Sequence, residues 1–254
     1  METRYILWTG GWDSTYRMIE LSKKDVTVQP VYILDEKRAS REYELRAIKK
    51  MTEMLRAREE TKAMINDAEI IRVADIPADE SIEKNAGMLK EKYGWGIQHN
   101  WTARVAKLYP MIEMCIEKVV KGYMPTRKII ADHGKLVETQ YGWIVDRDNS
   151  DDVLVSVLGN ITLPIFEITE EQMRVNVKEW GYEDVMSNIW FCHRPINGKP
   201  CGICSPCHTK MDSKMEFLLP ETAQKRFKRE RWIEEKLGSV PVKVYRRMVR
   251  LISK

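Results

Sequence analysis

Short apolar runs alternate with amphipathic stretches along the first 75 residues of the chain. Residues 4–8, 26–34 and 70–73 are mostly apolar or β-branched, which predicts three buried strands. Residues 14–22 and 41–67 place apolar side chains at helical spacing, which predicts two helices between those strands. Strands that alternate with helices pair in parallel through right-handed crossovers. The pattern therefore predicts an α/β fold built on a parallel sheet.

Beyond residue 75 the pattern predicts further elements that are less regular. They are a loop at 94–100, a helix at 101–122, a strand at 128–131, a polar irregular segment at 135–152 and a helix at 170–180. Pro110 would break the first of these helices. Thr169 is the expected N-cap of the second, because a threonine hydroxyl accepts from the free N–H groups of a helix start.

The irregular segment is rich in carboxylates. They are Asp146, Asp148, Asp151 and Asp152. Carboxylate oxygens suit a divalent cation, but an exposed acidic loop without an ion is the commoner case.

The composition is that of an ordinary globular protein, with 43% hydrophobic residues. The chain has no apolar run of about 18 residues, so neither a transmembrane helix nor a membrane partner is expected. The N-terminus enters a strand at once and lacks the pattern of a signal peptide, which favours a cytoplasmic location.

Charge is distributed unevenly along the chain. Residues 221–254 contain eleven basic and four acidic residues, whereas the whole chain has a net charge of +4. A basic tail can hold phosphates or an acidic partner, nucleic acid included, although nucleic acid is not the favoured partner here. The alternative is a solvated amphipathic helix whose Trp232, Ile233 and Leu237 pack inward.

Four of the five cysteines are clustered in the sequence. They are Cys192, Cys201, Cys204 and Cys207. In a reducing compartment such a cluster is more often a metal site than a pair of disulfides. Four thiolates suit a structural zinc ion, and an iron–sulfur cluster is the rival interpretation. His193 and His208 adjoin the cluster and could substitute for a cysteine. Cys115 lies in a stretch that is predicted to be helical, and it is expected to be a buried, inert thiol.

The first predicted strand ends in Gly10-Gly11 and turns directly into a helix. Glycines let the backbone N–H groups approach an anion, and the helix N-terminus adds partial positive charge. Hydroxyls of Ser14 and Thr15 can donate to phosphate oxygens, whereas Asp13 suits a Mg²⁺ ion or simply fixes the loop. The P-loop motif and the dinucleotide G-x-G-x-x-G fingerprint are both absent.

The turn Thr9-Gly10-Gly11-Trp12-Asp13-Ser14-Thr15 resembles the PP-loop of the ATP pyrophosphatases, with Thr9 in place of the usual serine. The resemblance implies an ATP site on an adenine nucleotide alpha hydrolase-like, Rossmann-like sheet. We therefore expect the nucleotide to contact Leu34 at the end of the second strand and the turn residues Thr9, Gly10, Gly11, Trp12, Asp13, Ser14 and Thr15.

A second resemblance comes from the cysteines. Phe191-Cys192-His193 followed by Cys201-Gly202-Ile203-Cys204-Ser205-Pro206-Cys207 is similar to the zinc motif of the 7-cyano-7-deazaguanine synthases, and Leu163-Pro164-Ile165 matches a preceding family segment. Members adenylate the carboxylate of 7-carboxy-7-deazaguanine with ATP, and ammonia then gives an amide and finally a nitrile. The resemblance covers residues 4–220 and implies ATP, Mg²⁺ and structural Zn²⁺ as cofactors. Many members are homodimers.

The predicted substrate pocket departs from the family. The family's Gly-Tyr-Pro-Asp-Cys-Arg segment is missing, and its Arg-Asn pair appears as His99-Asn100, with Arg104 a turn later. The motif positions nominate His99, Asn100, Arg104 and Asp132 as substrate contacts, and Asp13, Ser14 and Arg104 as catalytic residues. Alternatively, Arg104 forms a structural ion pair and His99 only caps the helix. The changed pocket makes either ammonia or an amine on a protein partner the acceptor.

Three functions remain open from the sequence. The first is an ATP-dependent carbon–nitrogen ligase acting on a deazapurine carboxylate, in deazapurine biosynthesis, DNA modification or antiviral defence. The second is a tRNA-modifying enzyme of the thiolation type, and the third is a non-catalytic nucleotide-binding subunit. The expected organisation is a nucleotide-binding domain at 1–189, a zinc knuckle at 190–220 and a basic helical tail at 221–254.

Overall fold

The computed structural model describes residues 1–119 and 122–252, which form two compact units. The first unit contains residues 1–35 and 45–189. The second unit contains residues 36–44 together with the chain from Trp190 onward. Lys254, the last residue of the basic tail, lies outside the described residues.

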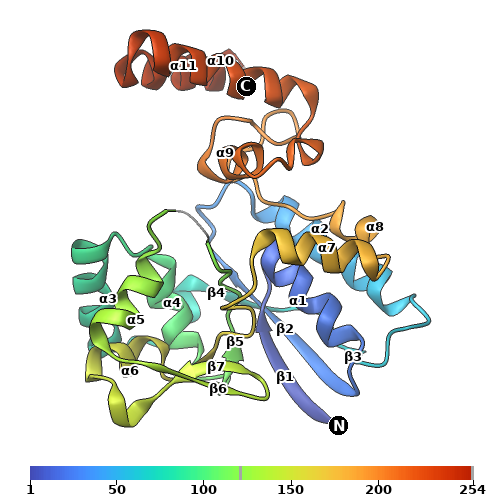
Figure 1. Cartoon of the computed structure of the whole chain (residues 1–254), viewed down its shortest axis with the longest axis vertical. Coiled ribbons are helices and arrows are strands. Elements are labelled where there is room, and N and C mark those ends of the chain that lie inside the picture. The colour runs from blue at the N-terminus through green and yellow to red at the C-terminus, as the bar shows by residue number, and fades with distance from the viewer. Residues whose placement is uncertain (120–121, 253–254) are drawn as a thin grey trace. The chain divides into compact units, whose positions relative to one another are not determined.

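A parallel sheet forms the centre of the first unit (Figure 1). Its strands are β1 (Glu2–Leu7), β2 (Val26–Leu34), β3 (Met64–Ile65), β4 (Glu69–Arg72), β5 (Ile112–Glu113) and β8 (Ile161–Thr162). The order is β3-β2-β1-β5-β8, and β4 pairs with the carboxyl-terminal half of β2. The chain thus moves from β1 first to one side and later to the other, which is consistent with a Rossmann-like fold.

Helices cover both faces of this sheet (Figure 1). One face carries α3 (Glu80–Tyr93), α4 (Gln98–Val105), α5 (Pro125–His133) and α6 (Asp152–Leu158), which enclose a large apolar core. The other face carries α1 (Trp12–Ser22), α2 (Arg41–Arg56), α7 (Glu170–Glu179) and α8 (Glu183–Met186). Short 3-10 turns are η1 (Val73–Asp75) and η2 (Arg147–Asn149). Alternation along β1 explains the two layers, because Tyr5 and Leu7 face the first core while Ile6 and Trp8 point the other way.

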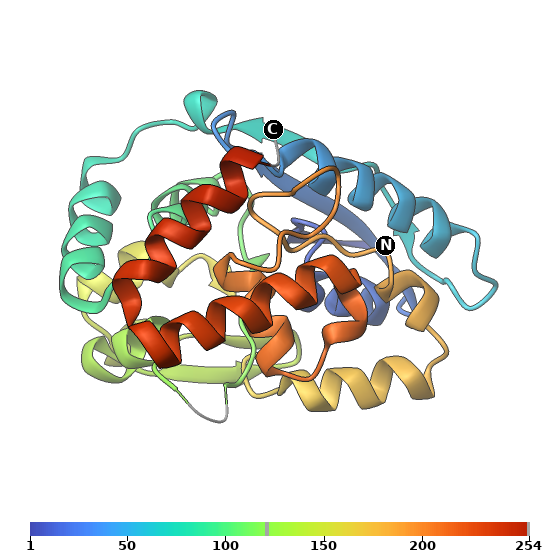
Figure 2. The same ribbon diagram turned by 90° about the horizontal axis from the view of Figure 1, so that it is seen from above.

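The second unit surrounds the four cysteines. It contains α9 (Ser205–Asp212), η3 (Glu216–Leu218), α10 (Glu221–Leu237) and α11 (Ser239–Ile252). Figure 2 shows α10 and α11 meeting end to end and then diverging. Tyr43 stacks on Trp190 at 4.5 Å between ring centroids, which ties residues 36–44 to this unit.

Several sequence predictions are confirmed. The strands at 4–8, 26–34 and 70–73 and the helix at 14–22 are all present within one or two residues. Thr169 caps α7 and forms a full capping box with Gln172, as its position predicts.

Other predictions are wrong. Residues 101–122 do not form one helix: α4 ends at Val105, and residues 112–113 form β5, while residues 120 and 121 lie outside the described residues. Residues 128–131 belong to α5 and not to a strand, because Pro125 begins a helix whose Ile129 and Ile130 reach the core. The helix predicted at 41–67 ends at Arg56.

The segment at 135–152 is more regular than predicted. It contains an antiparallel hairpin of β6 (Leu136–Thr139) and β7 (Gly142–Val145). Asp146 caps η2 and Asp151 caps α6, so two of the acidic residues satisfy helix starts. In the tail, Trp232 and Leu237 are 55% and 60% exposed, which contradicts their predicted inward packing, whereas Ile233 packs against the core of the second unit.

Candidate functional site

The glycine turn, residues 9–15, follows β1 at the point where the strand order reverses. β1 lies between β2 and β5, and all three strands run parallel. Ligands of open α/β sheets bind at the carboxyl ends of the strands, in the crevice at this reversal. The turn therefore occupies the position at which a nucleotide site is expected in such a sheet.

The turn presents an open helix N-terminus. Gly10 has a φ of +71°, a conformation that a residue with a Cβ seldom adopts. Gly11 is the N-cap of α1 in an extended conformation, and no side chain caps the helix there. A helix N-terminus attracts anions, because its first N–H groups have no intrahelical acceptor and its dipole is positive there. The helix start at Gly11 is therefore a candidate phosphate site.

Core contacts hold the turn in place. Trp8 Nε1 donates to Thr15 Oγ1 at 3.0 Å, and Thr15 Oγ1 lies 3.8 Å from Met51 Sδ. Thr15 is fully buried and Trp12 almost so. The hydroxyl of Thr15 therefore supports the turn from within, and Thr9 and Asp13 are the more exposed side chains of the turn. Ser14 is buried, and Leu34 is half-buried at the end of β2.

A buried ion triad connects α1 to the sheet. Glu113 of β5 is fully buried and receives Arg4 Nη2 at 2.5 Å and Arg17 Nε at 2.7 Å. Burial alone would lower the pKa of Arg17, but its hydrogen bonds and ion pair with Glu113 raise that pKa above the ordinary value. The triad joins β1, β5 and the helix that follows the turn. Sequence reasoning missed it, although arginines at inward positions of an apolar strand and helix were a usable signal.

Cys115 follows β5, near the triad. Burial raises the pKa of its thiol well above the ordinary value, and the charge of Glu113 raises it further. The raised pKa favours the protonated thiol, but the residue as a whole is half-buried and not fully buried as expected. It lies in a segment without regular secondary structure after β5 and not in a helix.

Three nominated substrate residues lie together on α4. The rings of His99 and Trp95 stack with a centroid separation of 4.4 Å. Among the described residues, His99 Nδ1, Asn100 Oδ1 and Arg104 Nε are buried without a hydrogen-bond partner. A buried polar atom without a hydrogen-bond partner destabilises the fold, and a bound ligand could supply the missing hydrogen bond. Ile97 is the N-cap of α4, so His99 does not cap the helix.

Only one of the two expected cations on α4, Arg104, is charged at neutral pH. Arg104 Nη1 lies 3.0 Å from Glu83 Oε1, which is the structural ion pair considered above. Burial lowers the pKa of His99 to about 4, so this ring is neutral at pH 7. Arg104 is therefore the cation of this cluster, and His99 can offer only neutral hydrogen bonds.

Asp132 lies apart from this cluster, on α5. It accepts from Tyr93 Oη at 2.9 Å and from Lys128 Nζ at 2.5 Å. The prediction that Asp132 follows a strand is wrong, since residues 125–133 are helical. In the described part of the chain, the side-chain hydrogen bonds and ion pairs of Arg104 and Asp132 go to α3, α5 and the segment before α3, and none goes to the glycine turn.

The four clustered cysteines converge on one point in the second unit. Their sulfur atoms all lie within 4.8 Å of one another, and adjacent pairs are separated by 3.4 Å (Cys204–Cys207) and 3.9 Å (Cys192–Cys204 and Cys201–Cys207). Four sulfurs at about 2.3 Å from a tetrahedral ion would be about 3.8 Å apart. None of these cysteines forms a disulfide. The group could hold a metal ion such as zinc, and it is the one such group among the described residues.

Backbone geometry supports this cluster. The N–H groups of Cys201 and Ile203 point at Cys192 Sγ (3.2 Å) and Cys201 Sγ (3.4 Å). Donors of this kind stabilise negative thiolates around a metal. Gly202 has a φ of +78°, and a Cβ there would overlap the backbone of Ala223 in α10. His208 lies against Glu230, at 3.2 Å from Nε2 to Oε1, and is not needed as a ligand.

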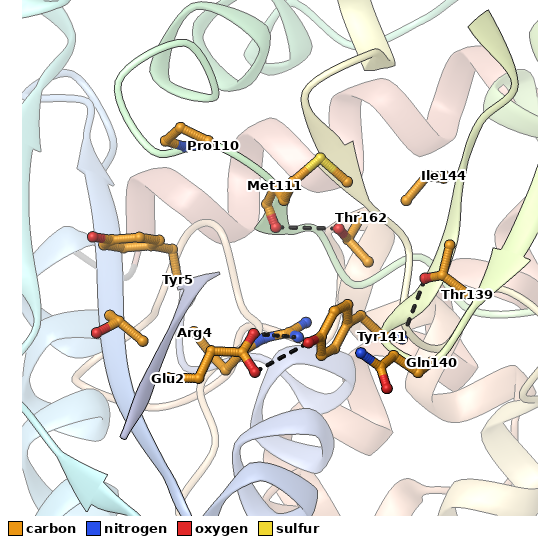
Figure 3. Close-up of a pocket in the computed structure, with 11 residues that line it drawn as sticks. Glu2, Arg4, Tyr5, Pro110, Met111, Thr139, Gln140, Tyr141, Ile144 and Thr162 are labelled. Atoms are coloured by element: carbon orange, nitrogen blue, oxygen red, sulfur yellow. Dashed lines mark hydrogen bonds and ion pairs between the residues drawn. The ribbon is translucent and has the colours of Figure 1, made fainter.

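A cavity of about 370 Å³ lies at the other end of β1, between that strand and the β6–β7 hairpin (Figure 3). The guanidinium of Arg4 lies over the ring of Tyr141 at 4.0 Å, and Tyr141 Oη donates to Glu2 Oε2 at 3.1 Å. The cavity is bordered by the amino-terminal half of β1, whereas the glycine turn follows the carboxyl end. It is therefore separate from the candidate nucleotide site.

No helix in the described residues is long and apolar enough to span a bilayer. Comparison with protein-family models finds no match for this chain, and comparison with curated proteins finds none either.

Proposed function

We propose that this chain is an ATP-dependent ligase with a PP-loop, which adenylates a carboxylate of the 7-carboxy-7-deazaguanine type. The observation that carries the proposal is the turn Thr9–Thr15 at the strand-order reversal, with its uncapped helix start. The resemblance of this turn and of the cysteine motif to the 7-cyano-7-deazaguanine synthases supports the chemistry. In this proposal the first unit has the adenine nucleotide alpha hydrolase-like variant of the Rossmann-like fold.

The proposed reaction begins at the turn. A carboxylate oxygen of the substrate attacks the α-phosphorus of ATP, the bond to the bridging oxygen breaks, and pyrophosphate leaves. In this proposal the backbone N–H groups at the start of α1, next to Gly10 and Gly11, would donate to the leaving pyrophosphate and stabilise its growing negative charge. Ser14 is placed to donate to a phosphate oxygen, and Asp13 is the proposed ligand of Mg²⁺, which would neutralise phosphate charge.

The acyl adenylate is then open to an amine. The amine nitrogen attacks the carbonyl carbon, AMP leaves, and an amide forms. Ammonia would give a primary amide, which a second activation by ATP could dehydrate to a nitrile. An amine on a protein partner would instead give a stable conjugate.

The orphaned atoms of α4 support a substrate contact. Arg104 is paired with Glu83 through Nη1, so in this proposal it offers the substrate carboxylate its unpartnered Nε. Asn100 and neutral His99 supply hydrogen bonds to a planar heterocycle. Asp132 is less suited, because Tyr93 and Lys128 already engage it. These roles rest on α4 alone and leave the acceptor amine open.

We assign the cysteine cluster to structural zinc. The sulfur separations fit a zinc tetrahedron, and a site with four protein ligands has no open position for chemistry. In this assignment all four clustered cysteines are metal ligands, and burial raises the pKa of the remaining thiol, Cys115, well above its ordinary value. A thiolation enzyme needs a reactive thiolate, so this alternative has less support.

ATP–pyrophosphate exchange with 7-carboxy-7-deazaguanine tests the proposal. Exchange should require the carboxylate, and mass spectrometry after addition of ammonia should identify amide or nitrile. Accumulation of amide with little nitrile would favour a changed acceptor. Exchange that is absent with this carboxylate, in protein that still binds ATP, would overturn the substrate assignment. Absence of ATP binding itself would overturn the whole proposal.

A further inference from the structure

Helix α11 carries an exposed apolar stripe. Its members are Val240, Val244, Met248 and Leu251, which are 71%, 56%, 50% and 63% exposed. Their spacing of four, four and three residues places them on one side of the helix. The opposite side is buried: Val242 is 6% exposed, Tyr245 belongs to the core of the second unit and Val249 packs against that core. The helix is therefore anchored by one apolar face and presents a second one to solvent, which is unusual unless that face binds something.

A row of cations borders the stripe. Lys243, Arg247 and Arg250 are exposed, and each immediately precedes a member of the stripe. Among the described residues these three form no ion pair, whereas Arg246 is engaged by buried Glu230 at 2.5 Å. The helix contains no acidic residue. Its exposed surface is thus apolar on one strip and cationic on the next.

The apolar stripe and the basic row together limit which kind of partner can bind this side of α11. A second copy that covered the stripe with its own α11 in an antiparallel pair would bring the two basic rows together, and like charges would oppose it. Nucleic acid would use the basic row but leave the apolar stripe exposed. The surface of an anionic bilayer can contact both strips. Its negative headgroups attract the basic row, and the boundary between headgroups and acyl chains accepts the apolar stripe.

We propose that α11 docks the protein peripherally on an anionic lipid surface. The apolar stripe enters the headgroup–acyl boundary, and the basic row contacts anionic headgroups. This goes beyond the sequence-based expectation of no membrane partner, which rested on the lack of a spanning segment. Peripheral docking needs no spanning helix, and the structure leaves one side of α11 exposed to solvent. The proposal is independent of the ATP chemistry.

Sedimentation of the full chain with vesicles tests the docking. One vesicle is pure phosphatidylcholine, and the other contains equal parts of phosphatidylcholine and phosphatidylglycerol. Binding is expected to the anionic vesicle alone and to weaken as salt is added. Each cation near the surface contributes about fivefold in affinity, so the triple variant Lys243→Glu, Arg247→Glu, Arg250→Glu should lose well over tenfold.

The stripe is tested by Val244→Asp with Met248→Asp, which should also lose more than tenfold. Matched controls are Val175→Asp on α7 and Lys228→Glu on α10, both at exposed positions, and they should bind nearly as the parent does. Circular dichroism and metal content check that each variant is folded. Failure of the parent to bind anionic vesicles, or equal binding by the stripe variant, would overturn the proposal. A parent dimer that the stripe variant converts to monomer would overturn it as well, because a second copy would then be the occupant.

Discussion

The glycine turn and the cysteine cluster are both local sites, but different forces hold them. The turn is fixed by an apolar core, by the hydrogen bond from Trp8 to Thr15 and by the triad around Glu113. The cysteine cluster is part of the hydrophobic core of the second unit. Three of the eight buried residues of that core are proposed metal ligands, namely Cys192, Cys201 and Cys207. The first site should therefore be formed before its ligand arrives, whereas the second should depend on its ion.

Metal removal should produce the largest effect and should separate the two sites. Structural zinc contributes about 10–16 kcal/mol of apparent binding energy, much of it folding energy. Chelation, or Cys207→Ser, should expose residues 190–210 to proteolysis and hydrogen exchange, with little change in β1 and α1. Cys115→Ser is the matched control and should keep its metal. Elemental analysis that finds iron and acid-labile sulfide would contradict the zinc assignment, and an unchanged second unit without metal would contradict the comparison.

Glu113→Gln should produce the next largest effect, this time in the first unit. The change leaves Arg4 and Arg17 buried without their carboxylate, which costs about 3–5 kcal/mol of unfolding free energy. Chemical denaturation measures the loss, and metal content should not change. Glu138→Gln on β6 is the exposed control, and it should stay within about 0.5 kcal/mol of the parent. A loss below about 1 kcal/mol for Glu113→Gln would show that the triad does not hold the turn.

The pH dependence of the first unit should report His99. Its pKa is lowered to about 4 in the folded chain, against about 6.5 when unfolded, so the unfolded chain binds more protons between these values. Stability should therefore be full above pH 6.5 and decline as the pH falls toward 4, by at most about 1.4 kcal/mol per pH unit. His99→Phe keeps a ring against Trp95 and should remove this part of the slope. An unchanged slope in that variant would contradict the burial of a neutral ring.

Thr169→Ala should have the smallest effect. Loss of the capping box at α7 should cost about 1 kcal/mol, and Thr169→Ser should restore most of it. Denaturation curves compare the two variants. Equal loss in both would mean that the methyl group of Thr169, and not its hydroxyl, stabilises the helix start.

Local patterns predicted the parts of the fold that local forces determine. The apolar run before Gly10, the spacing of the cysteines and the cap at Thr169 each act within a few residues. Residues 128–131 of α5 were predicted to be a strand because the adjacent isoleucines 129 and 130 favour a strand. The helix-start signal at Pro125 was not used. β5 is only two residues long, so no sequence window could separate it from a helix.

The long-range contacts could not be predicted. Glu113 meets Arg4 and Arg17 from about 100 residues away, and this pairing depends on the strand order. The pKa of His99 depends on burial against Trp95, which the sequence does not reveal. The exposure of α11 was missed for the same reason, because an amphipathic pattern shows that a helix has faces but not which of them are covered.

The binding of ATP to the glycine turn is the central claim, and calorimetric titration of Gly11→Ala with Mg·ATP tests it most directly. Gly11 has a φ of −80°, so alanine fits the backbone and the variant should fold, while its Cβ obstructs the approach of phosphate. Gly87→Ala on α3 is the matched control, because a Cβ there meets nothing within 4 Å. The account predicts that the parent and Gly87→Ala bind ATP alike and that Gly11→Ala binds at least about tenfold more weakly, a loss of about 1.4 kcal/mol. Equal affinity in all three proteins, or no binding by the parent, would contradict it.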